Sequence, residues 1–267
     1  MKNVTLKEIA DILGVSVSTV SRALTDSYEI NVETKKKVKQ LAKELNYLPN
    51  PFAASLRKHV SKTIALIIPE ISNNFFTRVI KGVEDACQEK DYYVLIYQTN
   101  ESYQKEQRII NHLIGGRVDG VLISVCSETE DVSHFQEVVK QNKPLILFDR
   151  VDERLKVPTV TLNDFKAGFI AANHLIERGY KKIAFVTTSH KIKIFSERLE
   201  GYKQALKLHS LPVLQEDIIL GGLSIKDGRF GISKLLRNGN RPDAIIAGDD
   251  FTALGVIKKL KEVGLAP

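Results

Sequence analysis

Apolar positions near the start of the chain recur at the three-and-four spacing of short amphipathic helices. The segment from Ile9 to Leu13 carries one apolar face, and it lies between Thr5 and Gly14. Thr5 and Glu8 stand at the spacing of a capping box. Glycine accommodates the left-handed turn that closes a helix. The pattern therefore predicts a first short helix between these two signals.

The same periodicity predicts two further helices. Ser16 is placed to cap a helix over Val17–Leu24, and Asn31 is placed to cap another that ends near Asn46. The residues expected to face inward are Val20, Ala23 and Leu24 in the second helix and Val38, Leu41, Ala42 and Leu45 in the third. Three short helices around one small core fit a helix-turn-helix unit, whose second helix enters the major groove of DNA.

From Lys62 onward the pattern changes to short apolar runs that alternate with helical segments. Strands are expected at Thr63–Ile68, Tyr93–Tyr97, Gly120–Ser124 and Leu145–Phe148, then in a second series at Thr159–Leu162, Ile183–Val186, Ile218–Leu220 and Ala244–Ala247. Helices are expected near residues 76–88, 103–113, 132–140, 167–177, 196–208, 226–237 and 252–263. Strands that are apolar on both faces and alternate with helices predict parallel sheets covered on each side.

The predicted fold class is therefore α/β, with a three-helix head followed by two lobes of parallel sheet. The predicted domains are residues 1–48 for the head, 49–61 for a hinge, 62–158 for the first lobe and 159–267 for the second, with the break near Pro158.

Three residues of the second helix are predicted to point outward, toward DNA bases. Arg22 suits a bidentate contact with guanine, Val17 suits a thymine methyl group, and Ser18 suits either a donor or an acceptor. Phosphate contacts, which fix the register of a protein on DNA, are expected from Ser16, Thr19, Ser21, Asn31 and Lys35. The alternative is that the serine and threonine side chains only cap helices and that Arg22 is a solvated surface charge.

Polar and aromatic side chains stand where the predicted strands end. They include Asn73, Asn74, Phe75 and Phe76, then Asp149 and Arg150, Asn163 and Asp164, and Asp249 and Asp250, while Arg198 opens a later helix. Ligands of open parallel sheets bind beyond the carboxyl ends of the strands. Carboxylate, amide and guanidinium groups beside aromatic rings suit a polyhydroxy ligand, whose hydroxyls must be paired on desolvation. The alternative is that these residues cap helices, a role expected above all of Asp164 and Asp250.

Composition narrows the class of protein. The net charge is +7, and residues 1–60 hold ten Lys/Arg against six Asp/Glu, which favours a polyanionic partner for the head. The two cysteines, Cys87 and Cys126, are expected as buried free thiols in a reducing compartment. No apolar run reaches transmembrane length and Met1 leads directly into the first helix, so a cytoplasmic protein without membrane contact is expected.

Enzyme signatures are absent from the sequence. It contains no GxxxxGK[ST], no GxGxxG after the first strand, and no nucleophile elbow. The six histidines are scattered without metal-ligand spacing. We therefore expect no catalytic residue, no metal and no cofactor.

The head resembles the DNA-binding headpiece of the lactose-repressor family of bacterial transcription regulators. The matching stretches are VTLKEIADILGVSVSTVSRAL and TKKKVKQLAKELNYLPNPFAASLR. The resemblance implies a hinge helix with Asn50 as cap and Pro51 at its first position. It also implies that Ala53 belongs to the hinge and that Leu56 inserts into the minor groove as a wedge. An ordinary core or linker leucine is the alternative for Leu56. With Thr5 included, the DNA-binding candidates are Thr5, Ser16, Val17, Ser18, Thr19, Ser21, Arg22, Asn31, Lys35, Asn50, Ala53 and Leu56.

The body is similar to the effector core of the same family, through IIPEISNNFF, LFDR, SERLEGY and AGDDFTALG. That core resembles periplasmic sugar-binding proteins. The resemblance implies a sugar or sugar derivative as effector, with contacts from Asn73, Phe75, Phe76, Asp149, Arg150, Asn163, Arg198 and Asp249. Asp249 occupies a position where asparagine is frequent in the family. A phosphorylated sugar or a purine stays open, and Lys191 and Lys193 are a weak sign of phosphate.

The resemblance also implies a homodimer on double-stranded operator DNA, controlled by a small-molecule effector. Full family members continue well past the stretch that matches Val263–Pro267, so we expect this sequence to be a fragment or a truncated chain. Two other readings of the sequence remain. One is a transport-type sugar receptor, which the DNA-binding head disfavours, and the other is a defective remnant of a regulator.

Overall fold

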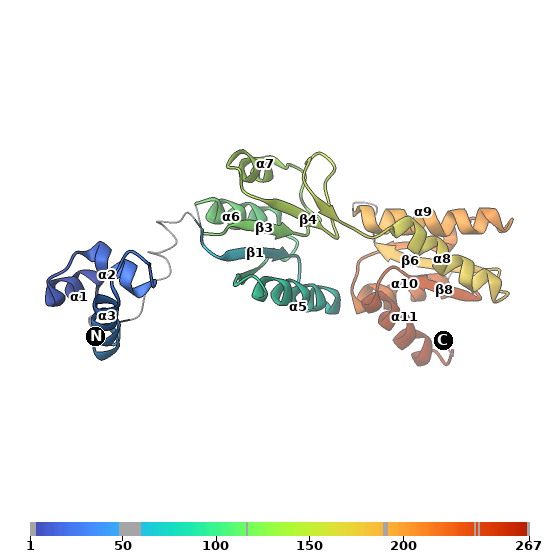
Figure 1. The fold of residues 1–267 in the computed structure, drawn as a ribbon. Coiled ribbons are helices and arrows are strands. Elements are labelled where there is room, and N and C mark those ends of the chain that lie inside the picture. Colours follow the sequence, from blue (N-terminus) through green and yellow to red (C-terminus); the bar gives the residue numbers. More distant parts are fainter. Residues whose placement is uncertain are drawn as a thin grey trace. The chain divides into compact units, whose positions relative to one another are not determined.

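A computed structural model of the chain describes residues 4–47, 60–115, 117–188, 192–237, 239 and 241–265. The chain divides into two compact units, Met1–Ser61 and Lys62–Pro267. The described residues of the first form helices without a strand, and the second contains two parallel sheets (Figure 1). This α/β architecture with a helix-turn-helix head confirms the predicted fold class.

The described part of the head contains helices α1 (Leu6–Leu13), α2 (Val17–Leu24) and α3 (Val32–Glu44). Thr5 and Glu8 form the predicted capping box, and Gly14 closes α1 with a left-handed φ of 65°. The buried core of this unit comprises Ile9, Ala10, Val20, Ala23, Val38 and Ala42, with Leu24, Leu41 and Leu45 partly buried against it. Local capping signals and one apolar stripe per helix are therefore enough to specify this unit.

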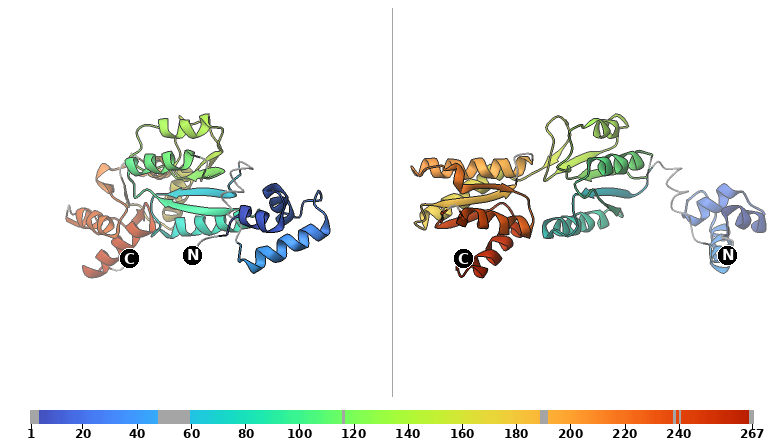
Figure 2. Two further views of the ribbon diagram at one scale, coloured as in Figure 1. Left: turned by 90° about the vertical axis from the view of Figure 1, so that its left-hand side faces the viewer. Right: turned by 180° about the vertical axis from the view of Figure 1, so that it is seen from behind.

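The first sheet of the second unit has the strand order β2-β1-β3-β4-β5, and all of its pairings are parallel. Its strands are β1 (Thr63–Ile68), β2 (Tyr93–Gln98), β3 (Gly120–Ile123), β4 (Leu145–Phe148) and β5 (Thr159–Val160). Helix α5 (Asn74–Gln88) covers one face, while α6 (Tyr103–Ile114) and α7 (Ser133–Lys140) cover the other, as both views in Figure 2 show. Apolar clusters fill both interfaces, which is why the central strands are apolar on both sides.

The second sheet has the order β7-β6-β8, again with parallel pairings. Its strands are β6 (Ile183–Thr188), β7 (Ile218–Gly221) and β8 (Ala244–Ala247), and the turn η1 (Gln215–Asp217) leads into β7. Its helices are α8 (Asp164–Glu177), α9 (Lys193–Leu208), α10 (Ile225–Arg237) and α11 (Asp250–Glu262). The first two pack on one face of the sheet and the last two on the other.

Helices α8 and α9 cross at unusually close range because each presents a glycine to the other. A Cβ built on Gly168 would overlap the carbonyl oxygen of Arg198, and one built on Gly201 would overlap the carbonyl oxygen of Phe165. No side chain fits at either position without moving a backbone. The two glycines therefore fix where Arg198 and Phe165 lie.

Three predictions about elements need correction. The strand at Thr159 was expected to open the second series, but Thr159–Val160 pairs with β4 and forms the edge of the first sheet. The connection from β4 is short and the outer edge of β4 is open, so this pairing is the nearest available. Strand β2 is not covered on both sides, since Tyr93 is 76% exposed and Leu95 and Ile96 are also exposed. Helices α8 and α11 are capped by Asn163 and Asp249, one residue before the expected Asp164 and Asp250.

The cysteine prediction holds only in part. Both thiols are free, but Cys87 in α5 is only partly buried. Cys126 is buried and lies in the loop after β3 rather than inside the strand. Across the described ranges, every helix is too short or too polar to cross a bilayer.

Candidate DNA interface and ligand cavity

Helix α2 carries an exposed polar face that fits the predicted base-reading surface. Val17 at its start is 41% exposed, and Ser18 and the Arg22 side chain are also exposed. Ser18 and Arg22 are four residues apart, so they share one face of the helix. The opposite face, with Val20 and Ala23, is fully buried in the core of the head. A buried face on one side and a polar face on the other leave the polar face available to a partner.

Arg22 has a partner that the sequence analysis missed. Its Nη1 lies 2.6 Å from a carboxylate oxygen of Glu29, in the segment between α2 and α3. The two side chains are 58% and 43% exposed. Exposed ion pairs of this kind contribute about 0–1 kcal/mol, because solvent screens them. Arg22 is therefore restrained weakly and can exchange Glu29 for a DNA group.

Two of the five residues predicted to contact phosphates, Ser16 and Asn31, serve as helix caps in this structure. Ser16 Oγ accepts the Thr19 amide at 3.1 Å, and Asn31 Oδ1 accepts the Thr34 amide at 2.9 Å. Thr5 is engaged in its capping box, and Lys35 donates to the carbonyl oxygen of Asp26 at 3.2 Å. The hydroxyl of Thr19 lies 2.9 Å from that of Ser16, and Ser21 is only partly exposed. Of the remaining DNA-binding candidates, Asn50, Ala53 and Leu56 lie outside the described residues, as does Lys191 of the second unit.

The head also exposes one aromatic side chain that the sequence analysis did not select. Tyr28, between α2 and α3, is 93% exposed. Single exposed apolar or aromatic side chains are common on protein surfaces, so the exposure of Tyr28 by itself assigns it no role. Its signal in the sequence was a tyrosine outside the apolar periodicity, within the polar segment that links two helices.

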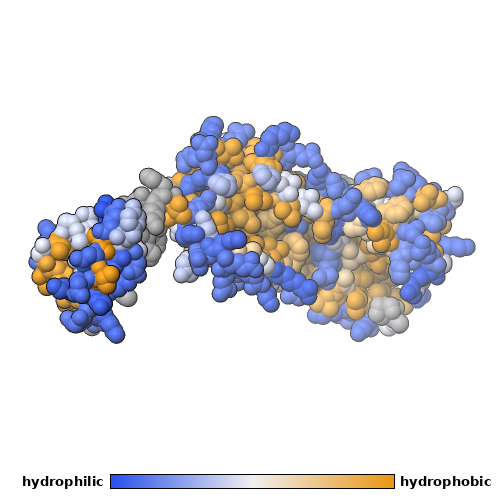
Figure 3. All heavy atoms as spheres, viewed as in Figure 1, coloured by the Kyte–Doolittle hydropathy of each residue, from blue (hydrophilic) through white to orange (hydrophobic). Residues whose placement is uncertain are grey.

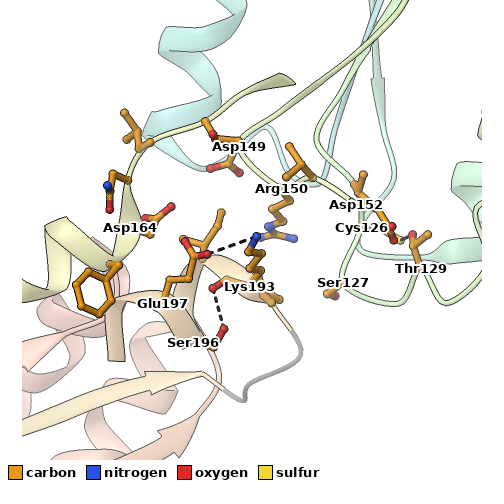
Figure 4. A pocket seen from close by; sticks show the side chains of 18 of the residues that line it. Cys126, Ser127, Thr129, Asp149, Arg150, Asp152, Asp164, Lys193, Ser196 and Glu197 are labelled. Atoms are coloured by element: carbon orange, nitrogen blue, oxygen red, sulfur yellow. Dashed lines mark hydrogen bonds and ion pairs between the residues drawn. The ribbon is translucent and has the colours of Figure 1, made fainter. Parts of the chain in front are cut away.

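The second unit contains a cavity of about 740 Å³. It is lined by the segments that follow β3, β4 and β5 and by the beginnings of α8 and α9. Asp149, Arg150 and Asp152 enter it from one side, and Lys193, Ser196 and Glu197 enter from the opposite side (Figure 4). The cavity thus lies at the carboxyl ends of parallel strands, where ligands of such sheets bind.

Three of the eight predicted effector residues line this cavity, namely Asp149, Arg150 and Asn163. Asn163 is also the cap of α8, where its Oδ1 accepts the Lys166 amide at 2.8 Å. Arg198 lies behind the lining, because its guanidinium donates to Asp164 Oδ1 at 2.8 Å and to the carbonyl oxygen of Gly248 at 2.8 Å. It therefore orients a lining carboxylate and ties α9 to the loop after β8.

The structure does not bring the other four predicted residues to the cavity lining. Asn73 caps α5 by accepting the Phe75 amide at 2.9 Å, and Phe75 is exposed. Phe76 is 3% exposed and packs edge-on against Phe148 in the core. Asp249 Oδ1 accepts the Thr252 amide at 2.7 Å as the cap of α11.

Asp149 is the most unusual charged group of the lining. Its backbone is left-handed, with φ of 57°, and its carboxylate accepts the Ser124 hydroxyl at 3.2 Å. Burial raises the pKa of Asp149 above its ordinary value, and the nearby Arg150 and Ser124 offset this only in part. Among the described residues, no cation forms an ion pair with Asp149. Its carboxylate is consequently free to accept hydrogen bonds from a ligand.

The loops after β2 and β3 supply lining residues and supports that the sequence analysis missed. Cys126, Ser127 and Thr129 face the cavity. Glu101 lies 2.6 Å from Arg150 Nη1, and it accepts the Ser127 amide at 2.8 Å. A weak signal was available, because Glu101 lies four residues after a predicted strand, but its partners are 26 and 49 residues away in the sequence.

A fully buried carboxylate supports the same wall. Glu106 in α6 accepts the Cys126 amide at 2.9 Å and the Thr129 hydroxyl at 2.6 Å, and it contacts His134 Nε2 at 3.0 Å. Burial raises the pKa of the Cys126 thiol to about 11, so this thiol stays protonated at neutral pH.

In the described portion of the chain, no three His, Cys, Asp or Glu side chains are grouped so as to hold a metal ion.

Comparison with known families matches both units. Residues 5–50 match the model of bacterial regulatory proteins of the lacI family. Residues 61–266 match the model of periplasmic binding proteins and the sugar-binding domain of the LacI family. The second match alone covers more than half of the chain.

Individual relatives agree with this. The chain is 33% identical to catabolite control protein A of Priestia megaterium, over 98% of this chain and 79% of that protein. It is 30% identical to the HTH-type transcriptional repressor CytR of Escherichia coli strain K12, over 98% of this chain and 76% of that protein. Among solved structures, a complex of the transcriptional regulator CelR with cellobiose matches with a TM-score of 0.68 and 26% identity, over 98% of this chain and 79% of that one.

Proposed function

Because the chain belongs to the lacI family and is a DNA-binding transcription regulator rather than an enzyme, we propose that it is a repressor controlled by a sugar-like effector. The observation that carries this proposal is the exposed face of α2, which presents Val17, Ser18 and Arg22 opposite a fully buried core. A relative with 30% identity is itself a repressor.

In the proposed complex, α2 lies in the major groove of a near-palindromic operator. Arg22 leaves Glu29 and donates to guanine, while Val17 and Ser18 contact neighbouring bases. Helix caps and backbone amides contact the phosphates and so fix the register of the protein on the duplex. The residues at or near these phosphates are Thr5, Ser16, Thr19, Ser21, Asn31 and Lys35. Asn50, Ala53 and Leu56 act in the hinge, with Leu56 as the minor-groove wedge. Because operator DNA lies in the bacterial cytoplasm, we also propose a cytoplasmic location for this protein.

The effector binds in the cavity of the second unit. Asp149 offers an acceptor that has no ion-pair partner among the described residues, and Arg150 and Asn163 add a guanidinium and an amide group. This mixture suits a ligand that carries both hydroxyl donors and acceptors. The relative CelR is seen with cellobiose, which is consistent with a sugar. The other predicted effector residues reach such a ligand only if it extends beyond the lining or if the segments that carry them move. They are Asn73, Phe75, Phe76, Arg198 and Asp249.

We also propose that the functional form is a homodimer. Strand β2 is an edge strand with exposed Tyr93, Leu95 and Ile96, and apolar residues reach the surface over this unit (Figure 3). Apolar edge strands are normally covered, because their unpaired backbone groups and apolar side chains favour association. A second copy covers this edge and supplies the second recognition helix that a palindromic site requires.

The two binding sites are coupled in this proposal, so each ligand changes the affinity of the other by the same factor. An effector that weakens operator binding must itself bind less tightly to the DNA complex. Selection of duplexes from a random pool, followed by affinity measurements with and without a panel of sugars, tests the whole proposal. We expect a near-palindromic motif and at least one sugar that shifts its affinity. Equal affinity for selected and random duplexes at moderate salt would refute it.

A further inference from the structure

We propose that Glu101 neutralises Arg150 and so reserves the cavity for uncharged polyhydroxy ligands, excluding phosphorylated ones. This inference rests on the proposed function of the cavity as the effector site. It makes Glu101 a specificity-determining residue, although the side chain itself is not part of the lining.

The first support is the way Glu101 is held. One carboxylate oxygen lies 2.6 Å from Arg150 Nη1, and the other accepts the Ser127 amide at 2.8 Å. Both contacts end on residues that line the cavity. A carboxylate with an amide on one oxygen and a guanidinium on the other cannot swing away without losing both hydrogen bonds.

The backbone around Glu101 supports the same conclusion. Asn100 and Glu101 both have left-handed conformations, with φ of 54° and 62°. For residues other than glycine this region costs energy, and two such residues in succession are uncommon. The turn directs the Glu101 side chain toward Arg150 and Ser127, which lie in loops after two other strands. The structure thus maintains this contact at a local cost.

The other cation of the lining, Lys193, also has carboxylates beside it, but this exposed pair holds its charge less firmly than Glu101 holds Arg150. Lys193 forms an ion pair with Glu153, which lies in the segment between β4 and β5, and its Nζ lies 3.5 Å from a carboxylate oxygen of Glu197 in its own helix. Both cations that line the cavity in the described part of the chain therefore already face carboxylates. The other charged side chains of the lining are carboxylates. Among them Asp149 is desolvated by burial.

An anionic ligand meets two obstacles in such a cavity. To bind Arg150, its phosphate must displace Glu101 or lie beside it, and like charges at close range in a partly buried site repel strongly. The exposed pairs of Lys193 with Glu153 and Glu197 act in the same direction but more weakly. A neutral sugar meets neither obstacle, since its hydroxyls donate to Asp149 and accept from the free N–H groups of Arg150. The charges of the cavity therefore select the ligand class independently of its shape.

The test uses the full chain and inorganic phosphate as probe, with binding measured by calorimetry in the absence of DNA. Glu101→Gln removes the charge but keeps an acceptor for the Ser127 amide. We expect it to bind phosphate about tenfold more tightly than the wild type, since the loss of one like charge at this range corresponds to about one pK unit. The gain must disappear when Arg150→Met is added to Glu101→Gln.

Two further variants control for charge and folding. Glu137→Gln makes the same charge change beside Lys140 on the surface of α7, and we expect no effect on phosphate binding. Glu153→Gln, at a carboxylate that is 76% exposed, partly frees Lys193 and should produce a smaller gain even if Glu101→Gln folds poorly. Glu101→Asp keeps the charge and should resemble the wild type.

Three results would overturn the inference. They are phosphate affinity unchanged in both Glu101→Gln and Glu153→Gln, a gain that survives Arg150→Met, and tight phosphate binding by the wild type that Arg150→Met abolishes. None of them depends on operator binding. The calorimetry tests the role of Glu101, and the selection of duplexes tests the proposed repressor function. A failure of one can therefore be distinguished from a failure of the other.

Discussion

Two arginines of this protein form ion pairs of the same length and are held in opposite ways. Arg22 on the head and Arg150 in the cavity each lie 2.6 Å from a glutamate oxygen. The Arg22 side chain is 58% exposed, whereas that of Arg150 is 13% exposed and its partner Glu101 is also held by the Ser127 amide. Distance alone does not say whether a charge is available to a ligand. Burial and the second hydrogen bond of the partner decide it.

The two units of this protein also present their functional side chains in different ways. The head offers side chains on a helix surface whose shape is fixed by local caps and a small core. The cavity offers side chains on loops whose positions depend on contacts between residues far apart in the sequence. Changes in the head should therefore act on DNA or on the head alone, and changes in the cavity wall should propagate.

The largest expected effect comes from the carboxylate behind the cavity wall. Glu106→Ala leaves the Cys126 amide, the Thr129 hydroxyl and His134 without their buried acceptor. Each unpaired buried group costs about 1–3 kcal/mol, so we expect a loss of about 3 kcal/mol or more. Urea unfolding should show this loss in the second unit while the head keeps its stability. The surface control Glu137→Ala should change the free energy of unfolding by less than about 1 kcal/mol. An equally small change for Glu106→Ala would show that Glu106 does not support the cavity wall.

The second largest effect is expected on operator binding, and it tests whether Arg22 is available for DNA. Arg22→Ala should weaken binding to a selected operator by about 1–3 kcal/mol and relax base preference at one position. Glu29→Ala, by contrast, releases Arg22 and should leave operator affinity equal or slightly higher, because the exposed pair contributes little. Fluorescence anisotropy with the operator and with single-base variants measures both. Unchanged base preference in Arg22→Ala would contradict the assigned readout.

A smaller effect is expected from the first cap. Thr5→Ala removes the side-chain acceptor of the Glu8 amide and one half of the capping box. Loss of such a cap costs about 1 kcal/mol. The thermal midpoint of the head should fall while that of the second unit stays constant. If both midpoints fall together, the two units do not unfold independently.

The smallest effect concerns pH. The pKa of Asp149 is raised by burial, so its protonated form favours folding below the ordinary value of 3.8. This contribution is lost as pH rises through the higher folded-state pKa. Asparagine does not titrate and tolerates the left-handed backbone at this position. The stability difference should therefore shift in favour of Asp149→Asn between pH 3 and pH 7, as measured by urea unfolding. A pH-independent difference would show that Asp149 is not desolvated in the free protein.

The sequence predicted the head almost residue by residue. The structure agrees with the predicted limits of α2 and with the capping box formed by Thr5 and Glu8. It also agrees with Ser16 and Asn31 as helix caps. These features depend on residues within four positions of one another, so a local reading contains the necessary information. The central strands were also predictable, because an apolar run between turns is a local signal.

The cavity was predictable only in outline. The rule that ligands bind at strand ends selected Asp149, Arg150 and Asn163, which do line it. The same rule selected Phe76, whose ring packs against Phe148 in the core, and it did not select Glu101. Whether a side chain at a strand end turns toward the cavity or toward the core depends on the packing around it, which strand position does not reveal.

The helices and strands, the ends of the helices in the head and the family of the chain are all recognisable from the amino-acid sequence. The pairing of Thr159–Val160 with the first sheet, the contact of Glu101 with Arg150, and the close approach of α8 and α9 at Gly168 and Gly201 become visible only in the folded chain. The two groups of features differ in the range of the interactions that produce them. Caps and periodicity act over one or two turns, whereas strand pairing, burial and charge neutralisation join residues that only the folded chain brings together.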